Sequence, residues 1–291
     1  MYKIIIYGSS GFLGKKLVKY LNKKNYSLLK DNKKLKNKFK KTKNLFNIFL
    51  KEIKKNQPDA IINLVALTNV DQCEKNKKLA DKTNAFFLMD LVKAINSYSK
   101  KVHLIHISTD QVYDGKGSHK EDATRPLNYY GHSKLQGESF VEKTFSTILR
   151  TNFIGKGDNK KKLNLSDWIV SNVEKNKKID VFKNIFFSPL HTSTLVKLIE
   201  KVIKEKKNGI FNLSSKSKVS KADFAKILCK QLKLSLKNIN QINYNYKSLL
   251  AKRPLDMSLN VTKFEKHYNV RLPKVFEEIK KLAKEYSSSI I

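Results

Sequence analysis

A tyrosine and a lysine four residues apart, Tyr130 and Lys134, could together protonate a carbonyl oxygen. Residues at this spacing lie on the same face of an α-helix, so the ammonium group of Lys134 would approach the phenol. A nearby positive charge favours the phenolate and lowers a tyrosine pKa from its ordinary value of about 10. Tyr130 could then act as the general acid toward a carbonyl group that accepts hydride. Tyr129 cannot form the same pair, because Ser133 stands four positions after it.

Two hydroxyl residues upstream strengthen this interpretation. A tyrosine and a lysine at this spacing occur by chance in many proteins, so the pair alone is a weak signal. Ser108 and Thr109 end an apolar run over residues 102–107, which is typical of a buried strand. A hydroxyl at the end of that strand could donate a hydrogen bond to the same carbonyl oxygen.

Three glycines near the start of the chain could hold the phosphates of a dinucleotide. Gly8, Gly11 and Gly14 follow an isoleucine-rich run and precede a segment with helical spacing. Glycines let the backbone approach a pyrophosphate, whose charge is stabilised by the free N–H groups at the start of a helix. The spacing is GxxGxxG rather than the GxGxxG of many dehydrogenases. The flanking strand and helix disfavour the alternative that these are ordinary turn glycines.

The residues after the second expected strand leave the choice of cofactor open. An acidic residue at this point favours NADH by binding the adenosine ribose, whereas a basic residue favours NADPH. Asp31 therefore argues for NADH, and its neighbours Lys30, Lys33 and Lys34 argue for NADPH.

The elements that position these residues alternate between strands and helices. This alternation predicts an α/β fold, a doubly wound parallel sheet with helices on both faces. Ligands of such sheets bind beyond the carboxyl ends of the strands. The glycine loop, residues 63–66 and residues 108–110 all fall at the carboxyl ends of expected strands, so we expect one shared site. The expected strands are 3–7, 26–29, 58–65 and 102–107, and the expected helices are 14–22, 45–55 and 79–97.

The composition is that of a globular protein with an unusually basic surface. The 291 residues include 40% apolar residues and carry a formal net charge of +35. Only four of the 60 basic residues are Arg, and the Lys residues are spread along the whole chain, so we expect a solvated surface and no nucleic-acid partner. Cys73 and Cys229 have no metal-binding spacing, and no apolar run is long enough to span a membrane. The first strand begins too early for a signal sequence, so we expect a reduced, cytoplasmic protein with no membrane or metal partner.

Motifs in order along nearly the whole chain resemble the dTDP-4-dehydrorhamnose reductase family of extended short-chain dehydrogenases. The strongest match runs from His106 through Gly115 and continues in residues 130–138, which contain the tyrosine–lysine pair. The further matches are residues 58–63, 68–71, Glu74, 84–85, 121–122, 126–128, 149–151, 253–254 and 258–260.

This resemblance implies a Rossmann-type NAD(P)-binding domain over residues 1–153, to which residues 181–205 return. It implies a smaller C-terminal α/β lobe for the substrate over residues 154–180 and 206–291. The implied reaction is the reduction of the 4-keto group of a nucleotide-linked 6-deoxy sugar by NADPH or NADH, in the synthesis of surface polysaccharide. The implied partner is therefore a nucleotide-linked 4-keto sugar.

The resemblance also implies roles for individual residues. Tyr130 would donate the proton, Thr109 would bind the sugar carbonyl oxygen, and Lys134 would hold the nicotinamide ribose. Together with the residue patterns above, the expected cofactor-binding residues are Gly8, Gly11, Phe12, Leu13, Gly14, Asp31, Asn63, Val65, Ala66, Tyr130 and Lys134. The expected substrate-binding residues are Thr68, Val70, Ser108, Gln111, Phe153 and Arg253.

The chain departs from the family pattern at positions that would touch the sugar. Members often have Tyr where this chain has Gln111 and Trp where it has Phe153, and smaller residues where it has Leu64 and Val65. The sugar and the nucleotide are therefore left open.

Two other functions and one assembly are also open at this point. One is a non-catalytic regulatory subunit like the β subunit of methionine adenosyltransferase, to which the same resemblance extends. The other is a nucleotide-sugar epimerase that uses the same cofactor without net oxidation. Folds of this class often dimerise through helices, so a homodimer is one possible assembly.

Overall fold

The computed structural model describes residues 1–31, 44–158, 163–245 and 249–288. The chain divides into two compact units, each built from three segments. Unit 1 comprises residues 1–112, 126–150 and 196–211, and unit 2 comprises residues 113–125, 151–195 and 212–291. The sequence predicts an N-terminal domain over 1–153 to which 181–205 return, whereas this division puts residues 113–125 and 151–153 in unit 2 and makes 196–211 the returning segment.

The sheet of unit 1 has six strands in the order β10-β5-β4-β3-β1-β2. The pairs β1–β2, β1–β3 and β3–β4 are parallel. After β1 the chain goes to one side for β2 and then to the other side for β3, so the strand order reverses beside β1. Ligands of such folds bind at this point of reversal. The strands are β1 Tyr2–Tyr7, β2 Tyr26–Lys30, β3 Ala60–Asn63, β4 His103–Thr109, β5 Ser146–Thr151 and β10 Gly209–Leu213.

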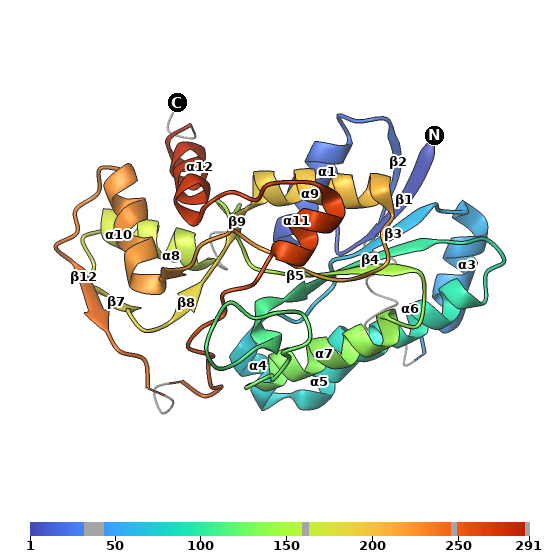
Figure 1. Ribbon diagram of the computed structural model, residues 1–291, viewed down its shortest axis with the longest axis horizontal. Helices are drawn as coiled ribbons and strands as arrows, with labels where there is room; N and C mark the ends of the chain where they lie inside the picture. Colours follow the sequence, from blue (N-terminus) through green and yellow to red (C-terminus); the bar gives the residue numbers. More distant parts are fainter. Residues whose placement is uncertain (32–43, 159–162, 246–248, 289–291) are drawn as a thin grey trace. The chain divides into compact units, whose positions relative to one another are not determined.

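Helices cover both faces of this sheet, which confirms the α/β fold predicted from the sequence (Figure 1). Helices α1 Phe12–Leu21 and α9 Thr192–Glu205 lie on one face, and α3 Phe46–Asn56, α6 Phe87–Asn96 and α7 Tyr129–Val141 lie on the other. Buried aromatic rings fill the space under α3 and α6, where Tyr7, Phe49 and Phe87 pack edge to face. The sequence predicts a loop over residues 30–43, of which 32–43 lie outside the described residues.

The long helix expected over residues 79–97 is interrupted. The structure has a short helix α5 at Lys77–Asp81, a π-helical turn at Lys82–Phe86, and then α6. The buried side chain of Asn84 explains the wider turn, because it accepts the N–H of Leu67 at 2.8 Å and donates to the Ser133 hydroxyl at 2.9 Å. The turn therefore ties the loop after β3 to helix α7, a use typical of π-bulges near functional sites.

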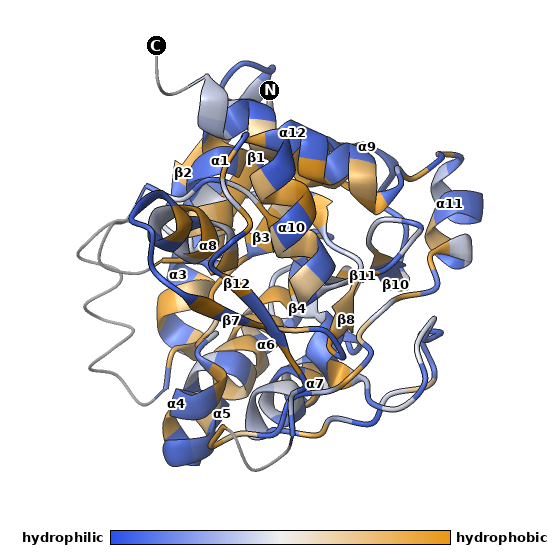
Figure 2. Cartoon of the chain, turned by 90° about the vertical axis from the view of Figure 1, so that its left-hand side faces the viewer, coloured by the Kyte–Doolittle hydropathy of each residue, from blue (hydrophilic) through white to orange (hydrophobic). Residues whose placement is uncertain are grey.

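In the described residues of unit 2 the strands are short and form three two-stranded sheets. Helices α8, α10 and α12 pack their apolar residues on one hydrophobic core, and α12 carries both hydrophobic and hydrophilic residues in Figure 2. The helices are α8 Leu165–Glu174, α10 Lys221–Gln231, α11 Thr262–Tyr268 and α12 Val275–Ser287. The strands are β6 Phe153–Ile154, β7 Ile179–Phe182, β8 Phe186–Phe187, β9 Leu190–His191, β11 Val219–Ser220 and β12 Ile239–Ile242.

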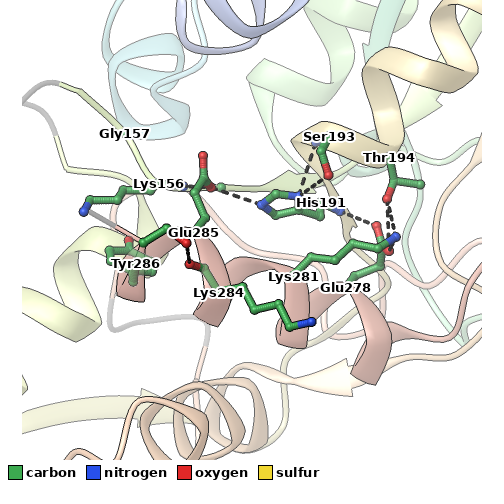
Figure 3. A network of polar contacts seen from close by, with 12 residues as sticks. Lys156, Gly157, His191, Ser193, Thr194, Glu278, Lys281, Lys284, Glu285 and Tyr286 are labelled. Atoms are coloured by element: carbon green, nitrogen blue, oxygen red, sulfur yellow. Dashed lines mark hydrogen bonds and ion pairs between the residues drawn. The ribbon is translucent and has the colours of Figure 1, made fainter. Parts of the chain in front are cut away.

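A polar network fastens α12 to strand β9 (Figure 3). The fully buried carboxylate of Glu278 accepts the backbone N–H of His191 at 2.6 Å and the ammonium group of Lys281 at 2.6 Å. Glu285, two turns further along, accepts the Lys156 N–H at 2.8 Å and contacts His191 Nε2 at 3.1 Å. None of the helices among the described residues has the length and apolar character needed to cross a membrane.

Candidate active site

The glycine loop joins β1 to α1 in a conformation that side chains would block. Gly8 has a φ of +84°, and a Cβ there would lie 2.8 Å from the Leu64 backbone. A Cβ on Gly14 would lie 2.2 Å from the Gly8 carbonyl oxygen. Helix α1 begins after Gly11 with no side-chain cap on its first N–H groups. The loop thus leads into a helix N-terminus that has no side-chain cap, which is the arrangement that binds phosphate.

Asp31 lies directly beside this loop at the end of β2. Its carboxylate accepts the Ser9 N–H at 3.0 Å and also the Ser9 hydroxyl. Asp31 is only 7% exposed, so its charge is held in place against the loop. The basic neighbours Lys33 and Lys34, which argued for NADPH, lie outside the described residues.

The segment after β3 passes on the other side of the glycine loop. The Asn63 side chain accepts the Val65 N–H at 3.2 Å, which shapes the turn out of the strand. Val65 and Ala66 are half-buried, Thr68 is exposed, and helix α4 Val70–Lys75 begins at the buried Val70. The expected cofactor-binding residues Asn63 to Ala66 and the glycine loop are therefore neighbours, as their positions at strand ends predict.

Tyr130 and Thr109 lie together at the carboxyl end of β4. Tyr130 is buried in the first turn of α7, and its phenol is hydrogen-bonded to the Thr109 hydroxyl at the end of β4. Burial raises the Tyr130 pKa above 10, and the Thr109 hydrogen bond opposes that rise. The lowering below 10 that the sequence predicts from Lys134 is not found: the Tyr130 pKa is raised, and the hydrogen bond that opposes the rise comes from Thr109, while Lys134 Nζ bonds to β4.

Lys134 is fully buried and bonded to β4. Its Nζ donates to the Ile107 carbonyl oxygen at 2.9 Å and lies 3.1 Å from His106 Nε2. Burial lowers the Lys134 pKa from 10.5 to about 8, and the charge of Glu138 partly opposes this. The tyrosine and the lysine thus share one helix face, as their spacing predicts.

The Ser108 side chain points toward a buried ion pair between Glu138 and Arg150. Its hydroxyl donates to Glu138, whose carboxylate also accepts Arg150 Nη2 at 2.6 Å and Nε at 3.0 Å. Ser108, Glu138 and Arg150 are all at most 5% exposed. In this conformation Ser108 helps to hold α7 against β4 and β5, and its expected contact with substrate stays a prediction.

Asn128 is a residue that the sequence reasoning missed. Its Oδ1 caps α7 by accepting the Gly131 N–H at 2.9 Å, and its Nδ2 donates to Gln111 Oε1 at 3.0 Å. An asparagine just before an apolar helical run is a typical N-cap signal, so the sequence held the clue. This one side chain orients both the helix turn that carries Tyr130 and the amide of Gln111.

Two expected substrate-binding residues, Phe153 and Arg253, lie in unit 2. Phe153 is half-buried at the start of β6. Arg253 is half-buried, and its Nη1 donates to the Ala251 carbonyl oxygen at 2.5 Å. Their roles stay predictions.

The residues of unit 1 fit a nicotinamide dinucleotide. The crowded glycine positions and the uncapped start of α1 suit the pyrophosphate, and Asp31 lies where an adenosine ribose is bound in such folds. Across the described residues, no group of three or more His, Cys, Asp or Glu side chains could hold a metal ion, and Cys73 and Cys229 are buried free thiols.

Comparisons with known proteins agree with this geometry. The family model described as RmlD substrate binding domain matches residues 2–288. A dTDP-4-dehydrorhamnose reductase from Sinorhizobium fredii is 30% identical over 249 residues, which cover 77% of this chain and 79% of the relative.

Solved structures show the same relationship. A dTDP-4-dehydrorhamnose reductase from Clostridium acetobutylicum superposes with a TM-score of 0.87 at 26% identity, covering 98% of this chain and 99% of the other. The enzyme of that name from Bacillus anthracis, solved in complex with NADP, has a TM-score of 0.87 at 25% identity, covering 98% and 100%. The chain therefore belongs to the RmlD substrate binding domain family, and its relatives named here are dTDP-4-dehydrorhamnose reductases.

Proposed function

We propose that the protein reduces the 4-keto group of a nucleotide-linked 6-deoxy sugar with NADPH or NADH, as a cytoplasmic enzyme of surface polysaccharide synthesis. The observation that carries the proposal is the buried Tyr130 phenol, hydrogen-bonded to Thr109 one helical turn from Lys134. The relatives named above are reductases, which favours this hypothesis over the regulatory subunit and the epimerase.

When bound, a nicotinamide cofactor would supply the hydride that the carbonyl carbon accepts in the proposed reaction. Tyr130 donates its hydroxyl proton to the carbonyl oxygen, so that the ketone becomes an alcohol. Thr109 donates a hydrogen bond to the same oxygen and stabilises the charge that develops on it. Lys134 holds the ribose beside this pair, and the burial of all three residues excludes water from the proton transfer.

We assign substrate selection to the substrate-binding residues expected from the sequence. Gln111 would present an amide to the sugar, held in place by Asn128. Thr68, Val70, Ser108 and Phe153 would complete the sugar contacts, and the Arg253 guanidinium would pair with the diphosphate.

The test is cofactor oxidation at 340 nm with a panel of nucleotide-linked 4-keto-6-deoxy sugars. Wild type should turn over at least one of them, and Tyr130→Phe should keep cofactor binding and lose most turnover. Tyr129→Phe is the matched control, because its hydroxyl bonds to Asp81 at 2.7 Å and not to Thr109. Full turnover by Tyr130→Phe would overturn the proposed role of this phenol.

The same samples test the other hypotheses. Isomerisation of a sugar nucleotide without cofactor consumption would indicate an epimerase, and copurification of a synthetase with an inactive protein would indicate a regulatory subunit. Light scattering on the purified protein would test the homodimer, which we include in the proposal.

A further inference from the structure

The backbone of Gln111 is fixed beside both residues of the proposed proton-donating pair. Its N–H donates to the Thr109 hydroxyl at 3.2 Å. Its carbonyl oxygen packs on the first turn of α7 at Gly131, the residue after Tyr130, where a Cβ would lie 2.1 Å from that oxygen. The half-buried Gln111 side chain therefore begins next to the place where the substrate carbonyl would be reduced.

Asn128 decides which end of the Gln111 amide remains for a ligand. The oxygen and nitrogen of an amide have nearly the same shape, so their orientation follows from the hydrogen bonds around them. Asn128 Oδ1 accepts the Gly131 N–H at 2.9 Å as the cap of α7, which leaves Nδ2 as a donor. This Nδ2 donates to Gln111 Oε1 at 3.0 Å. Reversing the Gln111 amide would place two donors face to face.

Gln111 Nε2 is therefore the end of the side chain that is left to recognise a substrate. Within the described parts of the chain, no hydrogen-bond partner faces this nitrogen. An amide NH₂ group donates hydrogen bonds and accepts none, whereas a tyrosine hydroxyl at the same position would do both. The chemical group that meets Gln111 must therefore be a hydrogen-bond acceptor.

We propose that Gln111 selects substrates that carry an acceptor oxygen at ring carbon 3 and rejects those that carry a protonated amine there. This selection rests on the proposed function, because it requires a 4-keto-6-deoxy sugar. In such a sugar carbon 5 carries a methyl group, so the polar substituent next to the carbonyl is the one at carbon 3. A hydroxyl or acetamido oxygen accepts from Nε2, whereas an ammonium group would bring donor against donor.

The orientation of the amide is tested without any ligand, by hydrogen exchange of side-chain NH₂ groups in nuclear magnetic resonance. In wild type the Asn128 hydrogens should be protected and those of Gln111 should exchange rapidly. In Asn128→Asp the carboxylate still accepts the Gly131 N–H but no longer donates, so Gln111 should turn its NH₂ group toward it. Exchange at Gln111 should then slow about tenfold, which corresponds to one hydrogen bond. Equal protection of both amides in wild type would overturn the proposal.

The selection is tested by calorimetry on the full protein with its oxidised cofactor and two nucleotide-linked 4-keto-6-deoxy sugars, one with a hydroxyl and one with an amino group at carbon 3. Wild type should bind the hydroxyl sugar more tightly. Gln111→Glu keeps the bond from Asn128 and presents a carboxylate oxygen in place of NH₂, so the ratio of the two dissociation constants should move about a hundredfold toward the amino sugar.

Gln136→Glu is the matched control, because Gln136 is a half-buried glutamine on α7 outside the site, and its ratio should equal that of wild type. An unchanged ratio in Gln111→Glu, or no binding of either sugar, would overturn the proposal. Binding with the expected ratios but without turnover would count against the proposed function alone.

Discussion

Burying the Lys134 ammonium group costs folding free energy, and replacing it should stabilise the protein at neutral pH. Lys134 is 1% exposed, and its pKa falls from 10.5 to about 8. At about 1.4 kcal/mol per pH unit, this lowering corresponds to a cost of about 3 kcal/mol at pH 7. The substitution Lys134→Met keeps an unbranched side chain of similar length and removes that cost.

The gain is reduced by the hydrogen bonds that methionine cannot make. Lys134 donates to the Ile107 carbonyl oxygen and contacts His106, and each bond contributes about 1 kcal/mol. The variant should therefore unfold with a free energy about 1 kcal/mol higher than wild type at pH 7.

The sign of this difference should reverse with pH. Because the pKa of Lys134 is lower in the folded protein, the unfolded chain binds more protons between about pH 8 and 10.5, and wild-type stability rises over that range. At pH 9.5 the ammonium costs only about 1 kcal/mol, so the variant should then be the less stable protein by about 1 kcal/mol.

Urea unfolding at the two pH values measures both quantities. Lys93→Met, at an exposed position of α6, is the control and should show little change at either pH. A variant that is destabilised equally at pH 7 and pH 9.5 would refute the reasoning, because the buried ammonium would then carry no cost.

Three further substitutions test other parts of the structure. Gly14→Ala places a Cβ 2.2 Å from the Gly8 oxygen, so a fluorescence titration should show weaker binding of NADH; unchanged affinity would mean that the loop is not a phosphate cradle. Asp31→Asn removes the charge beside the loop and should raise the affinity for NADPH relative to NADH about tenfold in the same titration, whereas a constant ratio would separate Asp31 from cofactor choice. Glu278→Gln weakens the bond to Lys281 and should lower the free energy of unfolding by about 2 kcal/mol in urea; a neutral result would mean that the network in Figure 3 adds no stability.

The sequence predicted the elements of unit 1 well because their signals are local. The isoleucine run before Gly8, the glycine spacing and the Tyr130–Lys134 pair each depend on neighbours within a few residues. The structure confirms the strand, the helix start and the shared helix face at these positions.

The differences arise where distant residues decide the local structure. The π-helical turn around Asn84 depends on hydrogen bonds to Leu67 and Ser133, which the periodicity of residues 79–97 does not encode. The orientation of Ser108 depends in the same way on Glu138, 30 residues later. Partners at such separations cannot be paired from one sequence, so the side-chain directions in the site could not be predicted.

The segment that returns to unit 1 affects the order in which the protein can fold during synthesis. Strand β10 is the edge strand beside β5, but it ends at Leu213, more than sixty residues after β5. A ribosome that has released only the first 150 residues therefore presents a five-stranded sheet whose β5 edge is unpaired. Unpaired edges associate with other chains, so we expect the nascent N-terminal portion to depend on chaperones until α9 and β10 emerge. For the same reason, a fragment cut after residue 150 would aggregate rather than serve as an independent cofactor-binding domain.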